Sequence, residues 1–193
     1  KRSYTYEIQN FANWFSYYRK RDLTAKNAIS KFVGVAANSQ YRVAHATVTG
    51  NDSASNASIL ALNASTTSGN TRTLLNAVYS SKPAGTTKAL RGQFNKVGRY
   101  FECLASNIFG SDCPIQSASE GGACQQNFAV LVTDGAWTDS SISNSVGDAD
   151  NDNSSTYDGG SYAGTGLDTL GDIAMHYYER DLSAALSNLV PVM

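Results

Sequence analysis

The sequence has few charges, few prolines and no long apolar run. Charged residues make up 16% of the 193 residues, and only three are prolines. No run of about 18 or more apolar residues occurs, so we expect no membrane span. The chain begins with Lys1 and Arg2, without an initiator methionine or a signal peptide, which predicts a fragment or a processed product.

What the sequence does contain is typical of one folded domain over residues 1–193. Apolar residues make up 41% and aromatic residues 10%, which argues against global disorder. Ser, Asn, Thr and Gly together supply more than a third of the chain. We therefore expect a surface solvated by hydroxyls and amides, which weakly favours an exported protein.

The small net charge of −1 hides a strong division along the chain. Residues 1–100 hold fourteen of the fifteen Lys and Arg, whereas residues 101–193 hold thirteen of the sixteen Asp and Glu. The positive residues form no run of the kind that binds nucleic acid, so we expect no nucleic-acid partner. The closely spaced aspartates of the second half favour a bound cation.

Apolar periodicity predicts the order of the elements. In chain order we expect a helix over 6–33, a hairpin of strands 41–48 and 59–62, helices near 74–78 and 90–104, a buried strand over 128–132, a polar loop over 136–166 and a helix from 167. Aromatic residues cover more than one face of the first helix. This favours burial under a sheet, with an interaction surface as the alternative.

Three cysteines are present without a CxxC pair or a nearby histidine, which argues against zinc. Cys113 and Cys124 flank a polar loop, and we expect these two to form a disulfide. The pairings of Cys103 with either partner stay open, as do three free thiols.

Two motifs could each supply a metal ligand. Asp134 follows the predicted buried strand 128–132, at the edge of a parallel sheet where ligands bind. An ordinary Asp-Gly turn would give the same residues. Thr86 and Thr87 follow a glycine before a helix and could ligate a hard cation through oxygen, or one of them could cap that helix.

The polar loop 136–166 contains a possible calcium site. Asp148, Asp150 and Asp152 are spaced at steps of two, as in the first half of an EF-hand loop, and Asp158 could supply a late carboxylate. The match is partial because Asn153 stands where that loop has glycine. The alternative is a solvated acidic loop without an ion.

No enzyme motif fits the sequence well. It contains no Gly-x-Ser-x-Gly, no Walker loop and no Gly-x-Gly-x-x-Gly. We expect structural roles for His45 and His176. Asp148-Ala-Asp150 is similar to the Asp-x-Asp of nucleotide-sugar glycosyltransferases, but nothing else supports a nucleotide site. We therefore expect a protein that is not an enzyme.

The order of elements and several sequence words resemble a known family. A long helix, a hairpin, a threonine loop and a buried strand ending in Asp-Gly resemble a von Willebrand factor A domain. Specific words resemble the PilC/PilY proteins, the tip-associated adhesins of type IV pili. These words are residues 10–21, 89–91, 97–101, 124–137, 146–152 and 170–182.

The resemblance implies an α/β fold of the von Willebrand A type, an open Rossmann-like sheet flanked by helices. It implies that Thr86 or Thr87 and Asp134 belong to an adhesion-type site for a calcium or magnesium ion. The Asp-x-Ser-x-Ser of that site is absent, and Asn51–Ser55 is expected to be a hairpin turn. The family's first strand and C-terminal domain are therefore expected to lie outside this chain.

The function that the resemblance implies is cell adhesion and type IV pilus biogenesis. The location would be the bacterial cell surface, outer membrane-associated, at the pilus tip. The partners would be minor pilins of the pilus tip complex and a host or surface receptor protein, bound with the help of a metal. The alternative is a structural docking module for minor pilins without a working metal site.

Overall fold

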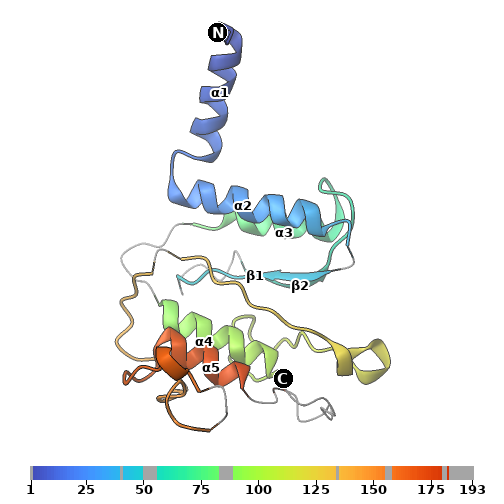
Figure 1. Ribbon diagram of the computed structural model, residues 1–193. Helices are drawn as coiled ribbons and strands as arrows, with labels where there is room; N and C mark the ends of the chain where they lie inside the picture. Colours follow the sequence, from blue (N-terminus) through green and yellow to red (C-terminus); the bar gives the residue numbers. More distant parts are fainter. Residues whose placement is uncertain are drawn as a thin grey trace. The chain divides into compact units, whose positions relative to one another are not determined.

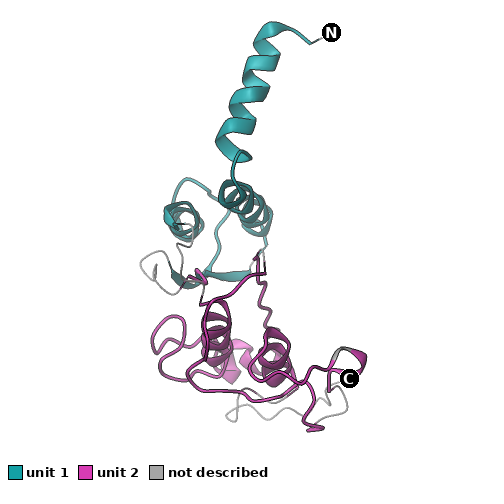
Figure 2. Ribbon diagram, turned by 90° about the vertical axis from the view of Figure 1, so that its left-hand side faces the viewer, with its two compact units in different colours: residues 1–46, 52–83 teal, residues 47–51, 84–193 magenta. Residues whose placement is uncertain are grey.

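The computed structural model describes residues 2–39, 41–49, 56–82, 89–133, 135–154, 158–179 and 182. The chain divides into two compact units (Figure 2), residues 1–46 with 52–83, and residues 47–51 with 84–193. The described elements are α-helices, short 3-10 helices and a two-stranded antiparallel sheet (Figure 1). The von Willebrand A-like fold and the single domain over 1–193 stay predictions.

Two helices take the place of the single helix predicted over 6–33. They are α1 (Tyr4–Tyr17) and α2 (Arg21–Ala36), separated by a break at residues 18–20. At this break the Thr24 hydroxyl donates to the carbonyls of Tyr18 and Lys20, at 3.4 and 3.2 Å. Side-chain hydroxyls of this kind compete with the regular hydrogen bonding of a helix.

The predicted hairpin is confirmed in the first unit. Strands β1 (Arg42–His45) and β2 (Ala57–Ala61) pair antiparallel, with Val43 opposite Leu60 and an irregularity before His45. Helix α3 (Gly69–Ser80) contacts both β2 and α2. The core of this unit consists of buried side chains from α2 and α3, namely Val33, Ala36, Leu74 and Val78.

The second unit is built around α4 (Leu90–Phe101) and α5 (Leu170–Tyr178), which pack against each other. Tyr177 on α5 donates its hydroxyl to Asn95 Oδ1 on α4 at 2.6 Å, and its ring lies against the backbone of Gly98. The same Asn95 donates through Nδ2 to the carbonyls of Ser143 and Asn144. Polar contacts therefore join α4, α5 and the acidic loop.

The apolar run 128–132 is not a buried strand in the described structure, and this prediction is wrong there. Its residues have no regular secondary structure, and Phe128, Val130 and Val132 are 79%, 87% and 58% exposed. A strand needs neighbours to satisfy its backbone N–H and C=O groups. Among the described strands, β1 and β2 pair only with each other, so they supply no neighbour here.

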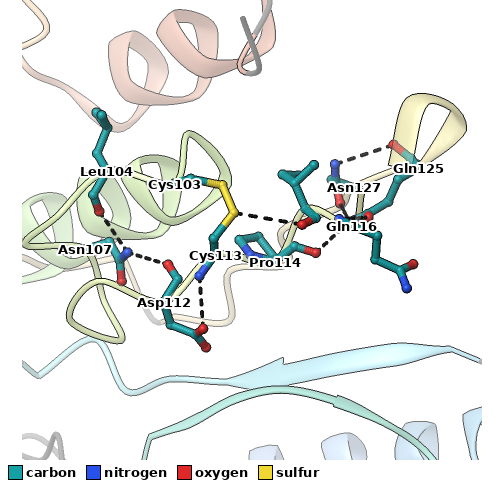
Figure 3. Close-up of a disulfide and its surroundings, with 10 residues drawn as sticks. Cys103, Leu104, Asn107, Asp112, Cys113, Pro114, Gln116, Gln125 and Asn127 are labelled. Carbon is teal, nitrogen blue, oxygen red and sulfur yellow. Dashed lines mark hydrogen bonds between the residues drawn. A yellow bond between two sulfur atoms is a disulfide. The ribbon is translucent and has the colours of Figure 1, made fainter. Parts of the chain in front are cut away.

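The predicted Cys113–Cys124 disulfide is also wrong. Cys113 is bonded to Cys103, with 4.6 Å between their Cα atoms (Figure 3), whereas Cys124 is free and exposed. Cys103 lies just after α4, and Asn107 Nδ2 donates to the carbonyls of Leu104 and Asp112. These bonds close the intervening loop and bring Cys113 back to the end of α4.

The rest of the second unit is mostly irregular. The described parts of the polar loop 136–166 contain one short 3-10 helix, Gly160–Tyr162, and two more precede the apolar run, Ala118–Glu120 and Gly122–Cys124. No helix in the described part of the chain is long and apolar enough to cross a bilayer.

Candidate metal centre

The acidic loop and the start of α5 together build a cluster of three carboxylates. Asp148 and Asp150 lie in a turn of the loop, whereas Asp172 lies in the first turn of α5. One oxygen from each carboxylate lies within 4.8 Å of the other two. Two oxygens bound to one Ca²⁺ at about 2.3–2.6 Å lie at most about 5 Å apart, so this spacing suits a shared cation.

Hydrogen bonds within residues 169–172 fix the position of the Asp172 carboxylate. Thr169 caps α5 by accepting the Asp172 N–H, and Asp172 Oδ2 accepts the Thr169 N–H at 2.7 Å. This capping box fixes the carboxylate at the helix N-terminus. Asp172 Oδ1 also accepts the N–H of Asp150 at 3.2 Å, which brings the loop to the helix end.

The cluster is largely shielded from solvent. Asp172 is fully buried and Asp150 is 7% exposed, and Asp150 Oδ1 accepts the Gly164 N–H at 3.0 Å. Asp148 is part-buried, but its Oδ1 is shielded and has no hydrogen-bond partner in the described structure. A buried carboxylate oxygen without a donor is costly, and a bound cation would supply the missing partner.

Electrostatics favour a positive charge at this point. Three carboxylates repel one another, and the N-terminal dipole of α5 and the backbone N–H groups offset this in part. The ion pairs found among the described residues, Arg2 with Glu7 and Arg91 with Asp139, lie elsewhere. Carboxylate oxygens are the ligands of hard cations such as Ca²⁺ and Mg²⁺. The donor set therefore fits such an ion.

The structure brings together only part of the predicted calcium loop. Asp148 and Asp150 are in the cluster, whereas Asp152 and Asp158 are not part of it. Asp152 is exposed, and hydrogen bonds from the Ser154 side chain and backbone lower its pKa. Asp158 Oδ2 accepts the Asn153 N–H at 2.7 Å, while its Oδ1 is shielded and has no partner among the described residues.

Sequence reasoning missed Asp172 as a candidate ligand. The signal that could have found it is the Thr-x-x-Asp capping box over 169–172, which places a carboxylate at a helix start that closes an acidic loop. The predicted adhesion-type ligands Thr86, Thr87 and Asp134 lie outside the described residues.

Arg91 holds another part of the loop against α4. Its Nε lies 3.5 Å from Asp139 Oδ1, its Nη2 donates to the Asp139 carbonyl, and its Nη1 donates to the Asp168 carbonyl at 3.2 Å. Asp139 Oδ2 accepts the Gly92 N–H, and the Trp137 ring lies 5.7 Å from the guanidinium. The loop is therefore fastened to α4 on one side and to α5 on the other.

Asp168 closes the loop just before α5. Its carboxylate accepts hydrogen bonds from the Ser145 hydroxyl and from the N–H groups of Val146 and Gly147, at 2.7–3.1 Å. Burial opposes ionisation of this carboxyl, but these hydrogen bonds and the charge of Arg91 outweigh it and lower the pKa. The ionised form therefore stabilises the folded loop.

We expect Asp168→Asn to destabilise this loop by about 1–3 kcal/mol, because an amide cannot accept all these bonds as a carboxylate does. Since the folded pKa is lowered, the stabilisation is complete above the unfolded value of about 3.9 and is lost as pH falls through the folded pKa. Urea unfolding across pH 2–7 measures this. The free energy of unfolding should fall less steeply toward low pH in the variant than in the wild type. The same pH dependence in the variant and the wild type would contradict this. Ser145→Ala, which removes a single donor, should change the pH dependence less than Asp168→Asn does.

The chain is similar in sequence to two curated proteins over almost all of its length. It is 29% identical over 184 residues to the type IV pilus biogenesis factor PilY1 of Pseudomonas aeruginosa strain PAK, covering 90% of this chain. The PilY1 of strain PAO1 is 29% identical over 198 residues, covering 92% of this chain. No protein-family model and no solved structure matches the chain.

The chain spans 15% and 16% of the length of these relatives. The alignments support the resemblance to the PilC/PilY proteins that the sequence words indicate, whereas the von Willebrand A-like fold stays a prediction. Over nine-tenths of its length, this chain is thus similar to the PilY1 type IV pilus biogenesis factors.

Proposed function

We propose that the chain is a cation-binding module of a type IV pilus biogenesis factor that acts at the cell surface, at the pilus tip. The similarity to PilY1 supports the pilus assignment. The observation that carries the cation is the cluster of Asp148, Asp150 and Asp172, with its shielded and unpartnered oxygen. The bound cation would neutralise the cluster and hold the loop on α5.

In this proposal the ordered loop presents a protein-binding surface for pilus subunits and a receptor. A second ion at the predicted adhesion-type site of Thr86 or Thr87 and Asp134 would keep an open position for a partner's carboxylate. The fold is proposed to be of the von Willebrand A type, completed by further strands. The ion is proposed to be Ca²⁺ or Mg²⁺, and the module is not an enzyme.

Titration of the chain with Ca²⁺ and with Mg²⁺ by calorimetry, alongside thermal melts, tests the cation. We expect saturable binding and a raised melting temperature, because an ion that binds only the folded form stabilises it by about 2.7 kcal/mol at 100 times its Kd. Asp148→Asn should weaken binding about tenfold or more and change the ion-free stability little, since Asp148 Oδ1 accepts no hydrogen bond from the described residues.

Asp152→Asn is the matched control, because it removes an exposed carboxylate of the same loop that lies outside the cluster. It should leave the affinity nearly unchanged. A folded chain that binds neither ion, or equal affinity in the wild type and Asp148→Asn, would refute the cation centre.

The hydrogen bonds of the cluster favour a second candidate. Asp150 and Asp172 each accept backbone N–H groups, so both could serve as structural acceptors without an ion. The module would then be a docking scaffold for minor pilins. Equal binding of purified minor pilins in Ca²⁺ and in excess EDTA would support this scaffold over the cation-dependent function.

A further inference from the structure

Helix α1 exposes an aromatic face that nothing in the described structure covers. No residue of Tyr4–Tyr17 is buried, in contrast to the predicted burial of this helix under a sheet. The exposed fractions of Ile8, Phe11, Trp14 and Phe15 are 51%, 63%, 51% and 46%. Apolar side chains so exposed and so close together mark an interaction surface.

Five of the exposed apolar and aromatic side chains lie on or beside one face of the helix. Residues 4, 8, 11 and 15 follow one another at steps of four and three, which places them on one face, and Trp14 borders it. The Phe11 ring lies 5.7 Å from that of Trp14 and 6.1 Å from that of Phe15. We call Tyr4, Ile8, Phe11, Trp14 and Phe15 the aromatic face.

The opposite side of α1 is polar but almost uncharged. It carries Thr5, Gln9, Asn13 and Ser16, and Gln9 donates to Asn13 Oδ1 at 3.0 Å. Two exposed tyrosines, Tyr6 and Tyr17, also lie on this side. The helix is therefore amphipathic, with one side suited to water and the other to an apolar environment.

Cations lie at both ends of α1. Arg2 precedes the helix and lies over the Tyr6 ring at 5.4 Å, while the Arg19 guanidinium lies over the Phe15 ring at 4.0 Å. Lys20 and Arg21 follow directly. Glu7, the only acidic residue within residues 1–21, borders the aromatic face and pairs with Arg2 at 3.8 Å, so the segment keeps a net positive charge. A surface that binds this face should therefore carry negative charges at its boundary and have an apolar layer below them.

We propose that α1 lies flat on an anionic lipid bilayer, with its aromatic face among the upper acyl chains and its terminal cations at the lipid phosphates. Amphipathic helices with Trp and Phe on one side and basic residues nearby bind membranes in this way. Basic residues near an anionic surface each contribute about 1 kcal/mol. This inference is independent of the cation centre, and it takes the aromatic face to lie outside the sheet of the proposed fold.

The composition of the face favours a bilayer over a groove on a protein. Helix α1 contains no Leu, Val or Met, and six of the fourteen residues in its range are aromatic. Tyr and Trp, with an apolar ring and a polar group, concentrate at membrane–water interfaces. A protein groove would need carboxylates placed opposite the cations at the two ends of the helix. An anionic bilayer offers negative charge along its whole surface and meets this requirement without special placement.

Vesicle flotation tests the proposal. The full chain should float with vesicles of phosphatidylcholine and phosphatidylglycerol in equal parts and bind vesicles of phosphatidylcholine alone at least about tenfold more weakly. Phe11→Ser with Phe15→Ser should reduce binding to the anionic vesicles about tenfold or more, because two rings no longer enter the bilayer. Arg19→Gln with Lys20→Gln should reduce it by a similar factor.

The control variant is Phe128→Ser with Val130→Ser, which removes two exposed apolar side chains outside α1. It should bind the anionic vesicles as the wild type does. Circular dichroism should show every variant folded, since each substitution is at an exposed position. Equal binding to both vesicle types, no binding to either, or an equal loss in the control would overturn the proposal; absence of binding would favour a protein partner for this face.

Discussion

Gly98→Ala should destabilise the second unit by about 2–4 kcal/mol, although alanine is the better helix former. Gly98 lies inside α4, where an added methyl group would overlap the ring of Tyr177. The ring cannot move away cheaply, because its hydroxyl is bonded to the buried Asn95. The helices would have to separate, which also exposes Ile173 and Leu90. Urea unfolding and hydrogen exchange of the α4 and α5 amides measure the effect.

Gly92→Ala is the matched control on the same helix. A methyl group there would meet Asp139 Oδ2 at 3.7 Å and Ile142 at 3.9 Å, which is ordinary contact. It should therefore be neutral or stabilise by about 0.5–1 kcal/mol through helix propensity. In a Tyr177→Ala background the cost of Gly98→Ala should disappear. A cost that persists without the ring would show that the clash with Tyr177 is not its cause.

Asn95→Ala should cost about 2–4 kcal/mol, because one buried amide joins three segments. Its Nδ2 donates to the carbonyls of Ser143 and Asn144 at 3.0 and 2.9 Å, and its Oδ1 accepts from Tyr177. Alanine at this position leaves two carbonyls and a hydroxyl without these partners. Hydrogen exchange should rise in residues 143–147, and the free energy of unfolding should fall.

Asn76→Ala is the comparison for this substitution. Asn76 is an exposed asparagine on α3, so alanine there should change the stability by only a few tenths of a kcal/mol, in the stabilising direction. A loss of stability at Asn95 no larger than at Asn76 would show that the amide does not hold the loop.

Apolar periodicity predicts helix α4 but not which of its residues are buried. The steps between Leu90, Phe94, Val97 and Phe101 predict a helix there, and the structure confirms it. The buried residues of α4 nevertheless include Arg91, Gln93 and Asn95, while Phe94 and Val97 are only half-buried. Periodicity reports a local tendency, whereas the loop that hydrogen-bonds to the polar side of α4 is about 45–50 residues away in sequence.

The carboxylate cluster was predicted in part for the same reason. Asp148 and Asp150 are close in sequence, so their spacing alone indicates a common site. Asp172 lies 22 residues beyond Asp150 and joins them because the capping box of α5 and the Asp150 N–H bond to its carboxylate. Such a ligand becomes apparent only when the helix start is placed against the loop.

The sequence by itself determined the hairpin, the helices α3, α4 and α5, the polar loop and the separation of charge along the chain, because these depend on neighbouring residues. Tertiary structure decided the pairing of Cys103 with Cys113, the exposure of residues 128–132 and the place of Asp172 in the cluster. Each depends on which distant segments meet, since a strand needs a neighbour and a disulfide needs two cysteines brought within reach by a closed loop.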